Sequence, residues 1–197
     1  MLLYNSSPSG NCYKVRLLLS QLGIEYDRVE VDTRSHANRE QLLGGKNPAL
    51  RVPVLELDDG RALAESNAIL WYVADGTRYL PEDAFERAQV LQWMFFEQYS
   101  HEPYVAVVRH RTMLGTLDTL PDLEVRRERG VAALEAMEAE LARREYFAAS
   151  SYSIADIALY AYTHVADEGG FDLSGYPSIN AWLDRVAAQP RHVTIDD

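Results

Sequence analysis

The sequence has only one cysteine, Cys12, among its 197 residues. Because no intrachain disulfide can form, this cysteine usage favours a reducing compartment, and we expect the protein in the cytoplasm. The five histidines form no close pair and no CxxC motif is present. The sequence therefore shows no structural zinc site, and we expect no metal cofactor.

Long apolar runs and nucleotide-binding motifs are also lacking. No apolar run approaches the ~20 residues that a membrane helix needs, and residues 1–5 do not begin a signal peptide. Neither a P-loop nor a GxGxxG motif occurs. Basic residues are scarce, with 19 lysines and arginines against 30 acidic residues and a net charge of −11. Such a surface repels phosphate backbones and anionic lipids, so we expect neither nucleic acid nor membrane as a partner.

The first part of the chain alternates strand and helix signals. Apolar segments predict strands at 2–4, 24–31, 52–57 and 61–64, and apolar residues at helical spacing predict helices at 12–22 and 66–74. Gly23 stands where a helix C-cap belongs, and the Asp58-Asp59-Gly60 turn predicts an antiparallel hairpin. A helix between the first two strands favours a parallel pair. The order βαβ-ββα predicts a small mixed sheet and a first domain at residues 1–76.

After Gly76 no strand pattern remains, and residues 77–83 are predicted to form a linker. Helices are predicted at 84–114, at 123–144, from 153 onward and at 178–188. Pro103 lies inside the first of these and is expected to kink or split it. Residues 84–197 are therefore predicted to form an all-helical second domain, which makes the fold class α+β.

Two short motifs in the first half have the chemistry of a peptide-binding site. Pro53 opens a strand after Val52, and a cis bond there would turn the Val52 backbone outward as an edge for an extended peptide. Glu65 and Ser66 open a helix, where free N–H groups and a hydroxyl suit a carboxylate and the glutamate suits an ammonium. Both motifs have structural alternatives, a trans proline on an edge strand and an ordinary N-cap at Ser66.

A third motif, Ser153-Ile154-Ala155-Asp156, is a capping box, with Tyr152 and Ile157 placed as a hydrophobic staple. The motifs VPVL, then ES about ten residues on, then SIAD in a helical half resemble those of the glutathione transferase family. Residues 9–16, SGNCYKVR, also resemble the first turn and helix of bacterial members. The resemblance covers essentially the whole chain.

This resemblance implies a thioredoxin-like, glutathione-binding domain followed by an all-α bundle. It implies that Val52 binds the cysteinyl backbone of glutathione with Pro53 cis, and that Glu65 and Ser66 hold the γ-glutamyl end. It further implies that the SIAD box directs folding of the bundle, and that the protein is a homodimer with an active-site cleft between its two domains.

Glutathione transfer requires the thiolate, so a hydrogen-bond donor or positive potential must lie near the sulfur. The turn before the first helix supplies both. If positions are counted back from Lys14-Val15, Ser9 stands where serine- and threonine-type relatives carry the activating hydroxyl. Asn11 is the second choice, as an amide donor to the same sulfur. A turn or helix-cap role for Ser9 stays open. Ser7 and Tyr4 are weaker candidates, and Cys12, on the apolar stripe of the helix, is expected to be a buried thiol rather than a partner in a mixed disulfide.

His36, in the loop after the second strand, is the candidate for the glycyl carboxylate of glutathione, with Lys46 or Asn47 as alternatives. For a second substrate, the aromatic-rich stretch after Ala84 could line an apolar pocket. The residues to test there are Tyr99, Tyr104 and Val105; plain bundle core or a dimer interface is the alternative.

We therefore expect a detoxifying glutathione transferase, in which the glutathione thiolate attacks a small apolar electrophile. The alternatives are a glutathione-dependent disulfide or peroxide reductase, and a non-catalytic glutathione-binding protein of the same fold, because a fold by itself does not fix an activity.

Overall fold

The computed structural model describes residues 1–35, 37–148 and 151–197, which form two compact units. The first unit contains residues 1–75 together with 189–197, and the second contains residues 76–188. The sequence had assigned all of 84–197 to the helical domain. Residues 189–197 instead join the first unit because their backbone carbonyls accept hydrogen bonds from its first helix.

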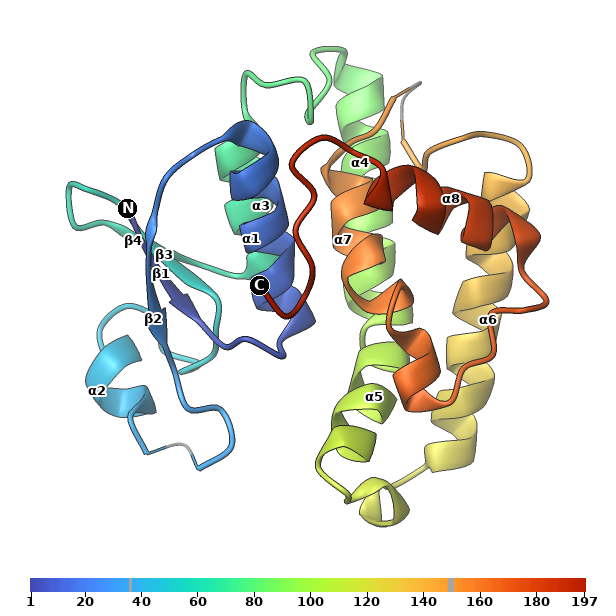
Figure 1. The fold of residues 1–197 in the computed structure, drawn as a ribbon, viewed down its shortest axis with the longest axis horizontal. Coiled ribbons are helices and arrows are strands. Elements are labelled where there is room, and N and C mark those ends of the chain that lie inside the picture. The colour runs from blue at the N-terminus through green and yellow to red at the C-terminus, as the bar shows by residue number, and fades with distance from the viewer. Residues whose placement is uncertain (36, 149–150) are drawn as a thin grey trace. The chain divides into compact units, whose positions relative to one another are not determined.

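The first unit is a four-stranded mixed sheet covered by helices (Figure 1). Its elements are β1 (Leu2–Asn5), α1 (Gly10–Leu22), β2 (Asp27–Glu30), α2 (Arg39–Leu43), β3 (Val54–Glu56), β4 (Ala62–Ala64) and α3 (Ser66–Ala74). The strand order is β2-β1-β3-β4. β1 pairs in parallel with β2 and antiparallel with β3, and β3 pairs antiparallel with β4. The predicted parallel pair and the predicted hairpin are both confirmed.

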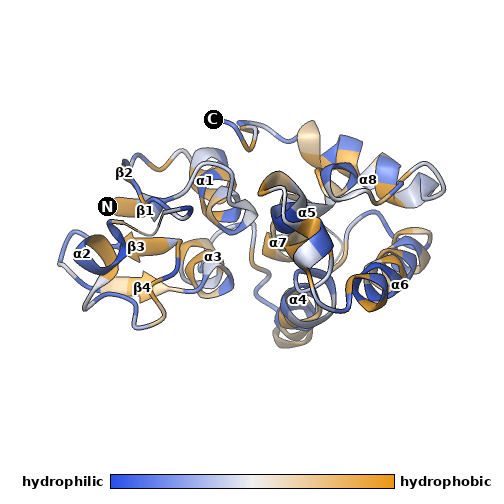
Figure 2. Ribbon diagram, turned by 90° about the horizontal axis from the view of Figure 1, so that it is seen from below, coloured by the Kyte–Doolittle hydropathy of each residue, from blue (hydrophilic) through white to orange (hydrophobic). Residues whose placement is uncertain are grey.

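Alternation of side chains along the strands supplies a core on each face of the sheet. One core joins β1 and β3 to α1 and α3 through Leu3, Val15, Leu19, Leu55 and Ile69. The other core lies on the opposite face, where α2 contributes, and contains Tyr4, Val31, Leu43 and Val54. Figure 2 colours much of β1, β3 and β4 as hydrophobic, as a sheet buried on both faces requires.

Local signals explain the helix boundaries in this unit. Gly23 adopts φ 69°, and its N–H bonds to the carbonyls of Leu19 and Ser20, so it is the C-cap that the sequence predicted. The helix predicted at 66–74 has these same bounds as α3. Between β2 and β3, the described residues of 32–47 contain the short helix α2 and otherwise form loop.

The second unit is helical in its described residues. Its elements are α4 (Ala84–Phe96), the π-helical segment η1 (Glu97–His101), α5 (Val105–Met113), the 3₁₀ turn η2 (Leu117–Thr119), α6 (Leu123–Leu141), α7 (Ile154–Thr163), the 3₁₀ turn η3 (Ala166–Gly169) and α8 (Pro177–Ala187). The split predicted near Pro103 is confirmed, since the chain leaves α4 through η1 and resumes as α5 after the proline. Glu102 N–H bonds to the carbonyl of Glu97 at 2.8 Å, five residues back, as a π-turn requires.

The predicted capping box is present at the start of α7. Asp156 accepts from the Ser153 N–H at 2.9 Å and from its hydroxyl at 3.1 Å. The same carboxylate accepts from the Phe147 N–H at 3.1 Å and from Trp182 Nε1 of α8 at 3.0 Å. Asp156 is fully buried, and this burial raises its pKa to about 6 although all four donors act in the opposite direction. One side chain therefore caps α7 and attaches α8 to it.

Both parts of the fold prediction are confirmed: the chain is α+β, with a thioredoxin-like first unit and a helical second one. Across residues 1–35, 37–148 and 151–197, none of the helices combines the length and apolar character needed to traverse a bilayer.

Candidate functional site

Ser9 occupies the N-cap of α1. The turn that precedes it is closed by a hydrogen bond from the Ser9 N–H to the carbonyl of Ser6 at 3.0 Å. The Ser9 oxygen accepts from the Cys12 N–H at 3.3 Å, and its backbone is extended, as in an N-cap. The helix-cap alternative for Ser9 is thus realised. The Ser9 hydroxyl also donates to the buried Cys12 thiol, so an activating role requires this hydroxyl to turn from Cys12 Sγ towards a bound sulfur.

Asn11, in the first turn of α1, contacts the first residue of α3. The Ser66 hydroxyl donates to Asn11 Oδ1 at 3.0 Å, and Lys14 Nζ lies 3.5 Å from the same hydroxyl. The Asn11 oxygen accepts this hydrogen bond, and the NH₂ group is the donor end of the same side chain. Ser66 is buried and Asn11 is half-buried. This contact brings the starts of α1 and α3 together, and with them two of the predicted binding residues.

The Val52–Pro53 peptide bond is cis, as the resemblance implied, and Pro53 directly precedes β3. The loop before it is shaped by Asn47, whose Nδ2 donates to the Arg51 carbonyl at 2.8 Å and whose Oδ1 accepts from the Ala49 N–H at 2.9 Å. Asn47 is buried, and a contact of its side chain with a ligand carboxylate stays a prediction. Its side chain already holds the loop that leads to Val52.

Glu65 lies between β4 and α3 with φ 69° and ψ 115°. This region of backbone conformation is uncommon for a residue with a side chain and costs about 1–3 kcal/mol. The Glu65 side chain makes no capping hydrogen bond to α3 and is exposed. An exposed carboxylate thus stands beside a helix N-terminus, with Ser66 next to it. That arrangement can accept an ammonium group and donate to a carboxylate on the same ligand.

Cys12 and Tyr4, the other thiol-activating candidates, are engaged elsewhere. Cys12 is fully buried, and burial raises its pKa to about 11 in spite of hydrogen bonds from the Ser9 hydroxyl and the Ser6 N–H. It is a structural thiol, as expected. The Tyr4 hydroxyl donates to Glu56 at 2.8 Å, while Lys46 Nζ lies 3.6 Å from Glu56 and above the Tyr4 ring. Lys46 therefore belongs to this cluster.

The remaining candidates do not share one environment. His36 lies outside the described residues. In the second unit, Tyr99 is 82% exposed on η1, whereas Val105 is fully buried at the start of α5. The Tyr104 hydroxyl accepts from Arg129 Nη1 at 2.8 Å. Within the described ranges, no three His, Cys, Asp or Glu side chains cluster in a way that could hold a metal ion.

The sequence interpretation missed three residues that hold the turn before Ser9, namely Asn5, Arg16 and Glu30. Arg16 Nη1 donates to Asn5 Oδ1 at 2.7 Å and Arg16 Nη2 to the Ser7 carbonyl at 3.2 Å, while the Ser7 N–H donates to Glu30 at 3.1 Å. The sequence did contain one signal for Arg16. It follows Cys12 by four residues, so a charged side chain lies on the helix face whose other residues were identified as apolar, and a buried charge needs hydrogen-bond partners.

Comparison with known proteins gives consistent matches over both units. Residues 8–75 match the family model for the glutathione S-transferase N-terminal domain, and residues 121–190 match the model for the C-terminal domain. A crystal structure of glutathione S-transferase from Pseudomonas fluorescens is 50% identical, with a TM-score of 0.96 over 100% of this chain and 98% of that one. Glutathione S-transferase 3 of Zea mays is 28% identical over 95% of this chain and 89% of its own length. The disulfide-bond oxidoreductase YfcG of Escherichia coli is 26% identical, covering 93% of this chain and 89% of that protein.

Proposed function

This chain belongs to the glutathione S-transferase family, and on that premise we propose that it binds glutathione and transfers its sulfur to a small apolar electrophile. The observation that carries the proposal is the 3.0 Å hydrogen bond between Ser66 and Asn11. It joins the helix start suited to an amino-acid end group to the helix start that carries Ser9. Glutathione has an α-amino acid at one end and a thiol on its middle residue, so one molecule could contact the start of α3 with the first and the start of α1 with the second.

The docking mode assigns each part of glutathione to a feature of the first unit. Glu65 accepts from the γ-glutamyl ammonium, while the backbone N–H groups at the start of α3, that of Ser66 included, donate to the γ-glutamyl carboxylate, because the Ser66 hydroxyl already donates to Asn11. The Val52 backbone pairs with the cysteinyl residue, as a strand edge pairs with an extended peptide. The cis bond at Pro53 and the exposed Glu65 side chain support this arrangement.

Ser9 and Asn11 have the chemistry needed to activate the thiol. A hydroxyl donor and an amide donor at the start of α1 stabilise a thiolate, and the positive end of the helix adds to the effect. The proton leaves the thiol for solvent. The thiolate then attacks the electrophilic carbon to form a thioether, and the leaving group departs with the carbon's bonding pair. Without such stabilisation, glutathione at neutral pH is mostly the weakly nucleophilic thiol.

The burial and raised pKa of Cys12 argue against a protein thiol as the nucleophile. A reductase that forms a mixed disulfide with its own cysteine is therefore disfavoured. The similarity to the disulfide-bond oxidoreductase YfcG supports a second candidate, reduction of a disulfide by bound glutathione. A non-catalytic glutathione-binding protein is the third outcome to be tested.

Glutathione affinity and turnover with three substrates distinguish these functions. Purified protein is titrated with glutathione and then assayed with an aromatic electrophile, an organic hydroperoxide and a small disulfide. We expect micromolar to millimolar affinity and turnover of the aromatic electrophile. Turnover of the disulfide or the hydroperoxide alone would make the protein a reductase. Binding without turnover would make it a binding protein, and absence of binding would refute all three.

For the second unit we propose that Tyr99 and Tyr104 contribute to the electrophile site, whereas Val105, predicted from the sequence with them, is fully buried and does not contact the ligand. We also propose that the protein is a cytoplasmic homodimer. The exposure of Phe85 (72%) and Phe95 (67%) on α4 supports a partner surface there. Light scattering of the purified protein tests the dimer. A monomeric mass at micromolar concentration would exclude it.

A further inference from the structure

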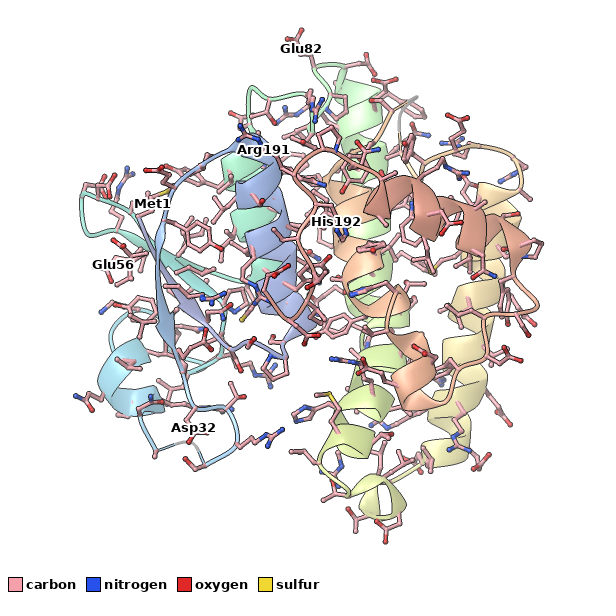
Figure 3. All side chains as sticks on the ribbon, viewed as in Figure 1. Met1, Asp32, Glu56, Glu82, Arg191 and His192 are labelled. Atoms are coloured by element: carbon pink, nitrogen blue, oxygen red, sulfur yellow. The ribbon has the colours of Figure 1, made fainter. Side chains whose placement is uncertain are left out.

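Residues 189–197, here called the tail, lie along α1 of the same unit (Figure 1). Alternate tail carbonyls accept hydrogen bonds from side chains at positions 13, 16 and 20, which share one face of α1. The pairs are Tyr13 OH to Val193 O (2.8 Å), Arg16 Nη2 to Ile195 O (2.6 Å) and Ser20 Oγ to Arg191 O (2.9 Å). Figure 3 shows Arg191 beside the C-terminal end of α1, where the chain of the tail begins to follow the helix.

Arg16 connects the tail to the turn that precedes Ser9. Its side chain is only 2% exposed. Besides the tail carbonyl, it donates to Asn5 Oδ1 at 2.7 Å and to the Ser7 carbonyl at 3.2 Å. All three acceptors are neutral oxygens. One planar guanidinium thus holds three segments in a fixed geometry, which a flexible ammonium does not reproduce.

Glu30, at the end of β2, holds the same turn from the other side. Its carboxylate accepts from Asn5 Nδ2 and from the Ser7 N–H, the latter at 3.1 Å. The turn is therefore fixed between a guanidinium and a carboxylate. Ser9 follows two residues later and is tied back to Ser6 by its own N–H at 3.0 Å. A shift of Asn5 and Ser7 therefore changes the position of the Ser9 hydroxyl.

The tail also contacts the first unit at two further points: Arg28 Nη1 of β2 donates to the Asp197 carbonyl at 2.6 Å, and His192 Nε2 lies 3.2 Å from the Tyr13 hydroxyl. A cavity of about 470 Å³ is lined by parts of α1 and by the tail, and Arg16, Ser20, Arg191 and Val193 are among its lining residues. Ile195, at 7% exposure, is a buried apolar residue of the tail. Of the tail contacts, the three hydrogen bonds to α1 are the ones that connect the tail to the helix of Arg16, so they help to fix the position of Arg16.

We propose that Arg16, held by the tail, is a positioning residue for Ser9. The inference rests on the proposed function, in which Ser9 stabilises the thiolate of bound glutathione. Loosening the tail removes one of the three acceptors of Arg16, so the turn relaxes and the Ser9 hydroxyl loses alignment with the sulfur. Misalignment by about 1 Å is enough to cost a large factor in rate. The residues proposed to grip glutathione, Val52 and Glu65, make none of these contacts, so affinity is retained.

The test measures the pKa of the thiol of bound glutathione from the ultraviolet absorbance of the thiolate, together with glutathione affinity and turnover. Arg16→Lys keeps the positive charge but not the planar fork. Tyr13→Phe combined with Ser20→Ala loosens the tail and leaves Arg16 intact. Arg61→Met is the matched control, because Arg61 is an exposed arginine of the same unit whose guanidinium, within the part of the chain that the structure describes, bonds to Asp59 and makes no contact with the tail.

Both test variants are expected to raise the pKa of the bound thiol by roughly 0.5–1 unit and to lower turnover by roughly three- to tenfold. Their glutathione affinity should stay within about twofold of the unmodified protein, and Arg61→Met should change nothing. The inference is overturned if the thiol pKa is unchanged in the tail variant, or if affinity falls in parallel with turnover, since that is general structural loss. The pKa needs no electrophile, so it decides the inference even if the unmodified protein binds glutathione without turnover. If the unmodified protein binds no glutathione, the proposed function fails and this inference fails with it.

Discussion

The hydroxyl of Ser66 donates a hydrogen bond to Oδ1 of Asn11 across 3.0 Å, which joins the first turns of α3 and α1. Two helix N-termini, each with positive potential, therefore meet in the first unit. One is adjacent to the exposed carboxylate of Glu65 and the other carries the cap residue Ser9. Substitutions at the two ends should consequently affect different steps, binding at Glu65 and thiol activation at Ser9.

Ser9→Ala is expected to lower turnover by roughly tenfold or more with nearly unchanged glutathione affinity, because it removes a donor that stabilises the thiolate. The substitution also removes the N-cap of α1, at a cost of about 1 kcal/mol in stability. Steady-state kinetics, glutathione titration and urea unfolding measure the three effects separately. Ser9→Thr retains the hydroxyl and the cap and should keep most of the activity. Undiminished turnover in Ser9→Ala would transfer the activating role to Asn11.

Glu65→Gln is expected to weaken glutathione binding by roughly ten- to a hundredfold, because it replaces a charge-assisted hydrogen bond worth about 1.5–3 kcal/mol. Isothermal titration calorimetry gives the affinity directly. Glu82→Gln is the control, since Glu82 is another exposed glutamate, just before α4, and belongs to the second unit, whereas the proposed contact is in the first. Equal affinities for the Glu65 variant and the unmodified protein would rule out the proposed docking of the γ-glutamyl end.

The Cys12 thiol is expected to be unreactive in the native protein, since it is fully buried with its pKa raised to about 11. A thiol-specific chromogenic reagent at pH 8 should react slowly with native protein and at once after denaturation. Cys12→Ala should lose some stability but retain turnover. Detection of a glutathione–Cys12 mixed disulfide by mass spectrometry under native conditions would contradict the assignment.

Asp156 is expected to make stability depend on pH in a defined direction. Its pKa is about 6 in the folded protein, against about 3.9 for aspartate in an unfolded chain. The folded state therefore binds the proton more tightly, so the contribution of this proton to stability is complete below about pH 4 and is lost as pH rises through about 6.

Asp156→Asn cannot titrate, and comparison with it cancels the contributions of all other groups. The free energy of unfolding of the unmodified protein minus that of the variant should fall by roughly 1–3 kcal/mol between pH 4 and pH 7. Denaturant unfolding at several pH values measures this difference. A difference that is constant, or that grows with pH, would show that the carboxylate is already ionised at acidic pH through its four hydrogen bonds.

Local signals in the sequence were sufficient for much of the fold. Gly23 ends α1 because only a residue without a side chain adopts its left-handed conformation at no cost. Ser153 and Asp156 start α7 because a capping box satisfies its own N–H groups. Pro103 interrupts a long apolar stretch because it has no N–H to donate. Each signal acts within about four residues of chain, so it can be identified in a single sequence.

The candidate site was predictable in part. The order and spacing of the motifs were sufficient to predict Ser9, Val52, Glu65 and Ser66. They also predicted Asn11, in the first turn of the helix that follows Ser9. The contacts between these residues could not be predicted, because the hydrogen bond between Asn11 and Ser66 links residues that are 55 positions apart in the sequence. The loop role of Asn47 was also missed, since a polar residue in a loop gives no sign of what it will bond.

By itself, the sequence determined which segments become strand or helix and which residue types stand at the two helix starts, because caps, turns and periodicity are properties of neighbouring residues. Only the tertiary structure decided that residues 189–197 return to α1. Arg16 and the Ile195 carbonyl are 179 positions apart, and a backbone carbonyl has the same chemistry at every residue. Such a contact leaves no pattern in the sequence. It exists because the folded chain brings a buried guanidinium, which needs acceptors for its several N–H groups, to a carbonyl near its own distant end.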